Sequence, residues 1–106
     1  MSQAKQAVNT LTDAATIAVD FSISSNHAVT VAGNRTFTFS NPQAGEIYSI
    51  KVIQDATGSR TITWPSTVKW AGGSAPTLTA TASKADFVFF YCDGTNYFDL
   101  AITKNY

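Results

Sequence analysis

Charged residues are scarce in this chain. They make up 13% of its 106 residues, with seven basic and seven acidic side chains and a formal net charge of zero. This charged fraction is about half of that in an average globular protein. The lysines and arginines occur singly, whereas a nucleic-acid backbone is bound by clustered cations. We therefore expect no nucleic-acid partner, and the weak charge repulsion favours association between copies.

Residues that hold metals or form disulfides are also nearly missing, because the chain has one cysteine and one histidine. Cys92 follows two aromatic residues, which predicts a thiol packed in the core rather than a reactive one. His27 lies in a predicted turn or strand edge, so we expect an ordinary surface histidine. One cysteine and one histidine cannot form a Cys/His zinc site, and no Asp-x-Asp-x-Asp calcium loop occurs. The sequence therefore predicts no metal and no cofactor.

Long apolar runs are absent as well. No run approaches the roughly 20 residues that cross a bilayer, and the N-terminus lacks a basic start followed by an apolar core. We therefore expect no membrane insertion and no signal peptide, with synthesis in the cytoplasm.

Groups that could perform catalysis do not converge in the sequence. No Gly-x-Ser-x-Gly nucleophile motif is present. Asp86 and Asp99 could in principle lie on adjacent strands as a glycosidase pair, but such pairs are common by chance. Gly72-Gly73-Ser74 lacks the lysine and the helix that follow a phosphate-binding loop, so it is interpreted as a plain turn. We expect that the protein is not an enzyme.

The pattern that is present is the alternation of apolar and polar residues with a period of two. It predicts strands within residues 16–23, 29–31, 36–39, 46–54, 60–64, 86–92 and 97–103. Turn residues separate these segments, most clearly Asp93-Gly94 before the last one. We predict an all-β fold, an antiparallel β-sandwich or jelly-roll-like barrel of six to eight short strands. Residues 1–12 are predicted to be an N-terminal arm, and residues 13–106 a single β domain.

Two segments are apolar on both sides. In residues 46–54, Ile47 and Ile53 make the second side partly apolar, which predicts a central strand covered on both faces. Residues 86–92 form the most apolar strand. Phe89→Ala in that strand is expected to cost on the order of 3–5 kcal/mol of stability.

Residues 58–78 hold both tryptophans and two of the three prolines. Together with a tyrosine from the last predicted strand, they supply the candidate interface or ligand surface: Trp64, Pro65, Trp70, Pro76, Leu78 and Tyr97. Aromatic faces suit stacking on the apolar faces of sugars. Trp and Tyr equally suit a core or a contact between subunits, because one end is apolar and the other can hydrogen-bond. Both interpretations stay open, with core or self-interface favoured.

This region resembles a β module found in virion proteins of tailed bacteriophages, often at the distal ends of tail fibres. The resemblance covers roughly residues 30–100 and rests on an ordered set of motifs: Thr63-Trp64-Pro65, Trp70, Gly73, Ala75-Pro76-Thr77-Leu78 and Asp93-Gly94-Thr95-Asn96. It implies a virion surface location, a β-sandwich and a homotrimer.

The chain departs from the fibre pattern because only a short arm precedes the domain, without a repetitive shaft. The leading hypothesis is therefore a non-enzymatic head decoration (cement) protein that stabilises the capsid. The alternative is a tail-fibre or receptor-binding tip module that recognises a glycan on the host surface. The expected partners are sister copies, the major capsid protein or other virion proteins, and, for the alternative, the host glycan. Residues 1–12 and the loop 71–84 are expected to contact other copies or the shell, because they are too small and polar for the core.

Overall fold

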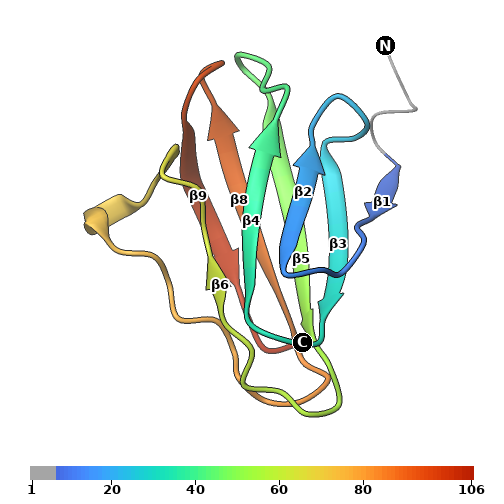
Figure 1. Cartoon of the computed structure of the whole chain (residues 1–106). Coiled ribbons are helices and arrows are strands. Elements are labelled where there is room, and N and C mark those ends of the chain that lie inside the picture. Colours follow the sequence, from blue (N-terminus) through green and yellow to red (C-terminus); the bar gives the residue numbers. More distant parts are fainter. Residues whose placement is uncertain (1–6) are drawn as a thin grey trace.

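The computed structural model describes residues 7–106 as two β-sheets that pack face to face (Figure 1). In chain order the strands are β1 (Val8–Thr10), β2 (Thr16–Asp20), β3 (Asn26–Val31), β4 (Arg35–Ser40), β5 (Ile47–Gln54), β6 (Ile62–Thr63), β7 (Val68–Lys69), β8 (Ala85–Cys92) and β9 (Tyr97–Thr103). A six-stranded sheet has the order β1-β3-β5-β8-β9-β7, and a three-stranded sheet has the order β2-β4-β6. The predicted all-β sandwich is confirmed.

The first six strands alternate between the two sheets along the chain. The odd-numbered strands β1, β3 and β5 lie side by side in the large sheet, and β2, β4 and β6 lie side by side in the small one. Among these six strands, neighbours in the sequence therefore do not pair. Each strand pairs in parallel with the next but one in the sequence, as at Ile17 opposite Phe37 and Val29 opposite Val52. The sheets are thus mixed, whereas the alternation in the sequence had predicted antiparallel pairing throughout.

The turn after β5 explains one of these differences. In the predicted antiparallel sandwich, residues 60–64 would return beside β5, but β6 pairs in parallel with β4 on the other sheet. Gln54 is buried, and its side-chain amide hydrogen-bonds to both backbone groups of Arg60. Nε2 of Gln54 donates to the carbonyl oxygen of Arg60 (3.0 Å), and Oε1 accepts the N–H of Arg60 (3.0 Å). The Gln54 side chain thus satisfies the two backbone groups of Arg60 that a neighbouring strand would otherwise bond, so the chain can leave β5 and cross to the other sheet at this point.

The antiparallel part of the fold is the set β5-β8-β9. The Asp93-Gly94 turn between β8 and β9 is confirmed. The carboxylate of Asp93 accepts the N–H groups of Thr95 and Asn96, and Gly94 has φ 99°. The β8–β9 ladder is irregular at Phe89 and Phe90.

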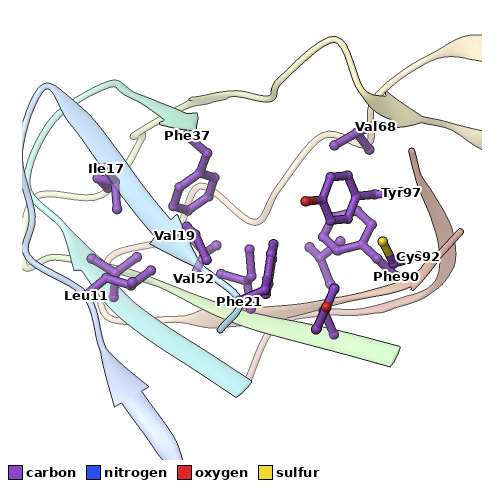
Figure 2. Packing of buried hydrophobic residues seen from close by; sticks show 14 of the residues in the cluster. Leu11, Ile17, Val19, Phe21, Phe37, Val52, Val68, Phe90, Cys92 and Tyr97 are labelled. Carbon is purple, nitrogen blue, oxygen red and sulfur yellow. The ribbon is translucent and has the colours of Figure 1, made fainter. Parts of the chain in front are cut away.

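The core lies between the sheets and is rich in aromatic rings (Figure 2). Phe21 stacks on Tyr48 with ring centroids 3.9 Å apart, and Phe90 is fully buried. Cys92 is buried too, which confirms its predicted place in the core, and burial raises the pKa of its thiol. Phe89 lies on the outer face of the large sheet and is only half-buried. The sequence-based prediction placed its largest truncation cost at Phe89, whereas Phe90 is the phenylalanine that lies in the core.

The N-terminal part of the sheet begins before residue 13. Residues 8–10 form β1, which pairs in parallel with β3, and Leu11 is buried in the core. Of the predicted arm, residues 1–6 lie outside the described part of the chain. Residues 7–11 are tied to the domain, since the N–H of Leu11 also bonds the carbonyl of Ala28.

His27 is not a surface residue, contrary to the sequence-based prediction. β3 already begins at Asn26, and its alternation turns the imidazole inward, where it is 1% exposed. Nε2 lies 2.9 Å from the carbonyl oxygen of Ser24 and Nδ1 lies 3.2 Å from the amide of Asn9. Burial lowers the pKa of His27 below its ordinary value of 6.5.

We therefore expect the protein to lose stability as the pH falls through 6.5. Below that pH the unfolded chain takes up a proton on His27, while the folded chain does not until its lower pKa is reached. Stability thus falls between the two pKa values. Urea unfolding at pH 8, 7, 6 and 5 measures this loss. The His27→Gln variant should show a shallower pH dependence in the same range, and an unchanged slope would contradict the assignment.

Candidate functional site

A groove of about 290 Å³ opens beside β6, between two irregular segments of the chain. One wall comes from residues 59–64 and the other from residues 76–80. The lining residues are Ser59, Arg60, Thr61, Ile62, Trp64, Pro76, Thr77, Leu78 and Ala80. The groove is therefore built from the same stretch that the sequence singled out for its tryptophans and prolines.

The first wall is fixed by the turn that leads into it. Asp55 accepts the N–H groups of Thr57 and Gly58, and it pairs with the guanidinium of Arg60 through Nε (3.2 Å) and Nη2 (3.0 Å). These bonds, with Arg60 the largest contributor, lower the pKa of Asp55 to about 2. Gly58 and Ser59 both have positive φ, so the chain turns sharply before it enters the groove. The Arg60 side chain is thereby held at the groove in one orientation.

The second wall is pinned to the domain by polar groups. The buried carboxylate of Asp86 accepts the N–H of Thr79 at 2.6 Å, and the amide of Gln54 donates to the Thr79 carbonyl at 2.9 Å. The N–H of Ser59 bonds the carbonyl of Ala80 at 2.7 Å, which joins the two walls. Part of the predicted contact loop 71–84 therefore belongs to its own domain.

Aromatic rings support the groove from the core side. Trp64 is half-buried and lies 5.1 Å from Phe37 and 5.3 Å from Trp70, between ring centroids. Both indoles also contact Phe90 at 5.8 Å. The groove thus combines an indole and aliphatic surface with hydroxyl groups and one fixed guanidinium. Such a surface can hold a small ligand that has both apolar and hydroxyl-bearing faces.

Comparison with protein families gives a match for residues 10–97 to the model described as "Putative phage tail fibre C-terminal domain". The chain belongs to this family. The tail fibre domain is thus a phage structural protein and a component of the virion. The family supports the tail-fibre alternative better than the head-decoration hypothesis. Neither the curated proteins nor the solved structures that were compared with the chain include a match.

The six sequence-predicted surface residues of the tail fibre domain divide into three groups. Trp64, Pro76 and Leu78 line the groove. Trp70 and Pro65 are half-buried beside it, and Trp70 packs against the core cluster. Tyr97 is 2% exposed, because it lies on the inner face of β9, so its side chain belongs to the core and not to a surface.

Arg60 and the hydroxyl-bearing Ser59 and Thr61 also line the groove, and the sequence-based prediction missed them as site residues. A signal was present in the alternation itself. In the predicted strand 60–64, an alternation with a period of two places Arg60 on the same side as Ile62 and Trp64, so Arg60 could have been assigned to the same surface. The ion pair with Asp55, which holds the Arg60 guanidinium at the groove, could not be predicted from the sequence.

Asp86 and Asp99 do not form a catalytic pair. Asp86 lies opposite Val52 and accepts the N–H groups of Thr79 and Asn105, whereas Asp99 lies opposite Phe90 and accepts the N–H of Ala71. Each carboxylate holds a separate loop. Within residues 7–106, no three His, Cys, Asp or Glu side chains are grouped to hold a metal ion. No helix of the same part of the tail fibre domain is long and apolar enough to span a membrane.

Proposed function

We propose that the protein is a non-enzymatic distal module of a tail fibre that binds a saccharide of the host cell surface in the groove beside β6. The observation that carries the proposal is the meeting of Trp64, Leu78 and a fixed Arg60 in one open groove. The family match supports the tail-fibre location, and the groove supplies the recognition chemistry.

The groove suits a sugar because its walls offer two kinds of contact. The indole of Trp64 and the side chains of Pro76 and Leu78 can cover the apolar face of a pyranose ring. Thr61 and Thr77 are among the lining residues, and their hydroxyls can exchange hydrogen bonds with sugar hydroxyls.

The groove is also organised before a ligand arrives. A hydrogen bond between Ser59 and Ala80 joins its walls. The N–H and the carbonyl of residue 79 are both hydrogen-bonded, to the side chains of Asp86 and Gln54. A site that needs little ordering loses less free energy on binding, so a shallow groove can still select a ligand.

A glycan array with the purified domain tests the proposal. We expect binding to a limited set of host-surface saccharides, with loss of at least about tenfold in affinity, roughly 1.4 kcal/mol, in the Trp64→Ala variant. Because Trp64 also packs on Phe37, a second variant is needed. Thr77→Trp fills the groove from an exposed position and should abolish binding with an unchanged melting temperature.

Thr38→Trp is the matched control, because it introduces the same side chain at an exposed position of the small sheet outside the groove. Binding should survive in this variant. A folded domain that binds no saccharide on the array, or binding that Thr77→Trp leaves intact, would refute the proposal.

A further inference from the structure

Within residues 7–106, Arg60 is the one charged residue that lines the groove beside β6. A guanidinium has five N–H groups. Two of those on Arg60 bond Asp55, from Nε at 3.2 Å and from Nη2 at 3.0 Å. The others have no partner in the described part of the chain, and 25% of the Arg60 side chain is exposed. One edge of the guanidinium is therefore fixed by the protein, and the edge formed by Nη1 and Nη2 is left for a ligand.

The acidic side chains around Arg60 are engaged within the protein. Asp55 accepts N–H groups of its own turn as well as those of Arg60. Asp13, which also acts on Arg60 electrostatically, is paired with Arg35 at 2.8 Å. Asp86, which holds the second wall, accepts two backbone N–H groups and is 2% exposed. Of the residues that the structure describes, no acidic one lines the groove, so an anion in the groove meets no carboxylate.

Lys104 adds a second positive group, at the opposite wall. Its ammonium donates a hydrogen bond to the carbonyl of Thr77, which lines the groove. Lys104 is exposed, and among residues 7–106 it forms no ion pair with a carboxylate. The charge of Arg60 is balanced by Asp55, whereas the charge of Lys104 is not. Both walls therefore carry cationic N–H groups, and the groove attracts anions.

Given the proposed function, on which this inference rests, we infer that the saccharide is acidic and that its carboxylate or phosphate group pairs with Arg60. The open edge of the guanidinium offers two parallel N–H groups, which match two oxygens of either anion. A neutral sugar would displace water from the guanidinium and return only hydrogen bonds to hydroxyl groups. It would lack the opposite charge that makes an arginine–carboxylate or arginine–phosphate pair strong.

The test is a glycan array of paired oligosaccharides that differ only in the acidic group: galacturonate against galactose, glucuronate against glucose, and mannose 6-phosphate against mannose. In the pairs that bind the wild-type domain, we expect the acidic member to bind at least about tenfold more tightly. The preference should shrink as NaCl is added, because salt screens the charges. The uronate and phosphate pairs together show which of the two anions Arg60 takes.

Two variants test the cations themselves. Arg60→Lys keeps a positive charge beside Asp55 but removes the second edge of the guanidinium, so the tenfold preference should be lost, with urea unfolding as the check on the wall. Lys104→Gln should lower the affinity for the acidic member by about two- to fivefold, because an exposed charge contributes little. Lys69→Gln is the matched control, since Lys69 is also exposed and bonded to a carbonyl, that of Ser66, but lies outside the groove.

The outcomes separate this inference from the proposed function. Equal binding to both members of each pair, or a preference that survives both Arg60→Lys and Lys104→Gln, would overturn the acidic ligand. Binding of neutral saccharides that Thr77→Trp abolishes would do so as well, while the groove would stand as a saccharide site. A folded domain that binds no saccharide would overturn both.

Discussion

Phe90→Ala is expected to lower the free energy of unfolding by about 3–5 kcal/mol. The ring is fully buried and contacts Phe39, Trp64, Trp70 and Tyr97 at centroid distances of 5.8–6.4 Å. Its removal leaves a cavity that these rigid rings cannot readily fill. The folded state then loses the free energy gained by burying the Phe90 ring and also the ring's van der Waals contacts with its neighbours. Equilibrium unfolding in urea, followed by tryptophan fluorescence, measures the change.

Phe89→Ala is the matched control, because it removes the same side chain from the adjacent position of the same strand. Phe89 is half-buried on the outer face, and its truncation leaves no enclosed cavity. Its cost should be clearly smaller when both variants are compared at a concentration where the chain is monomeric. Equal losses for the two variants would contradict the assignment of the inner and outer faces of β8.

Gly58→Ala is expected to destabilise the domain by about 2–5 kcal/mol, from backbone strain and overpacking together. Gly58 has φ +76°, and a Cβ atom there would lie 2.6 Å from the carbonyl oxygen of Ala80 and 2.8 Å from the nitrogen of Ala82. Both contacts are with backbone, which cannot rotate away. The wall of the groove formed by residues 76–80 would shift as well, so saccharide binding should weaken along with stability. Urea unfolding gives the first effect and the glycan array the second.

Gly72→Ala separates the steric part of this effect from the conformational part. Gly72 has nearly the same φ, +79°, but a Cβ atom there would meet nothing within 4 Å. The left-handed conformation alone should cost about 1–2 kcal/mol in that variant. If the two glycine variants were equally stable, close packing between the two walls of the groove would be disproved.

The sequence predicted seven of the nine strands that residues 7–106 form, missing β1 and β7, but it did not predict how the strands pair. Alternation at residues 16–20, 35–40 and 97–103 reports only that one side of a strand is buried, and it does so equally in parallel and antiparallel sheets. The Asp93-Gly94 turn was recognisable because its chemistry is local. The course of the chain after β5 depends on the buried amide of Gln54, which meets residues 60 and 79 only in the folded state.

The candidate site was predictable to a similar extent. Trp64, Pro76 and Leu78 were identified from composition, and they do share one groove. Tyr97 was placed with them because an aromatic residue near a turn gives no sign of which face it occupies. The inward position of His27 was missed because the strand was predicted to begin only at residue 29. Val29 and Val31 have the same phase as His27, so extending the strand back to Asn26 turns the imidazole inward as well.

The alternation of the first six strands between two sheets also bears on how fast the domain reaches its native state. Partners such as Val8 and Asn26, or Arg35 and Ile62, are far apart in the chain, and β8–β9 is a hairpin between consecutive strands. Chains whose contacts are mostly distant in sequence fold in milliseconds to seconds, because loop closure precedes the gain from each contact. Refolding should therefore be slow for a domain of this size, with the β8–β9 hairpin as the natural place for it to begin.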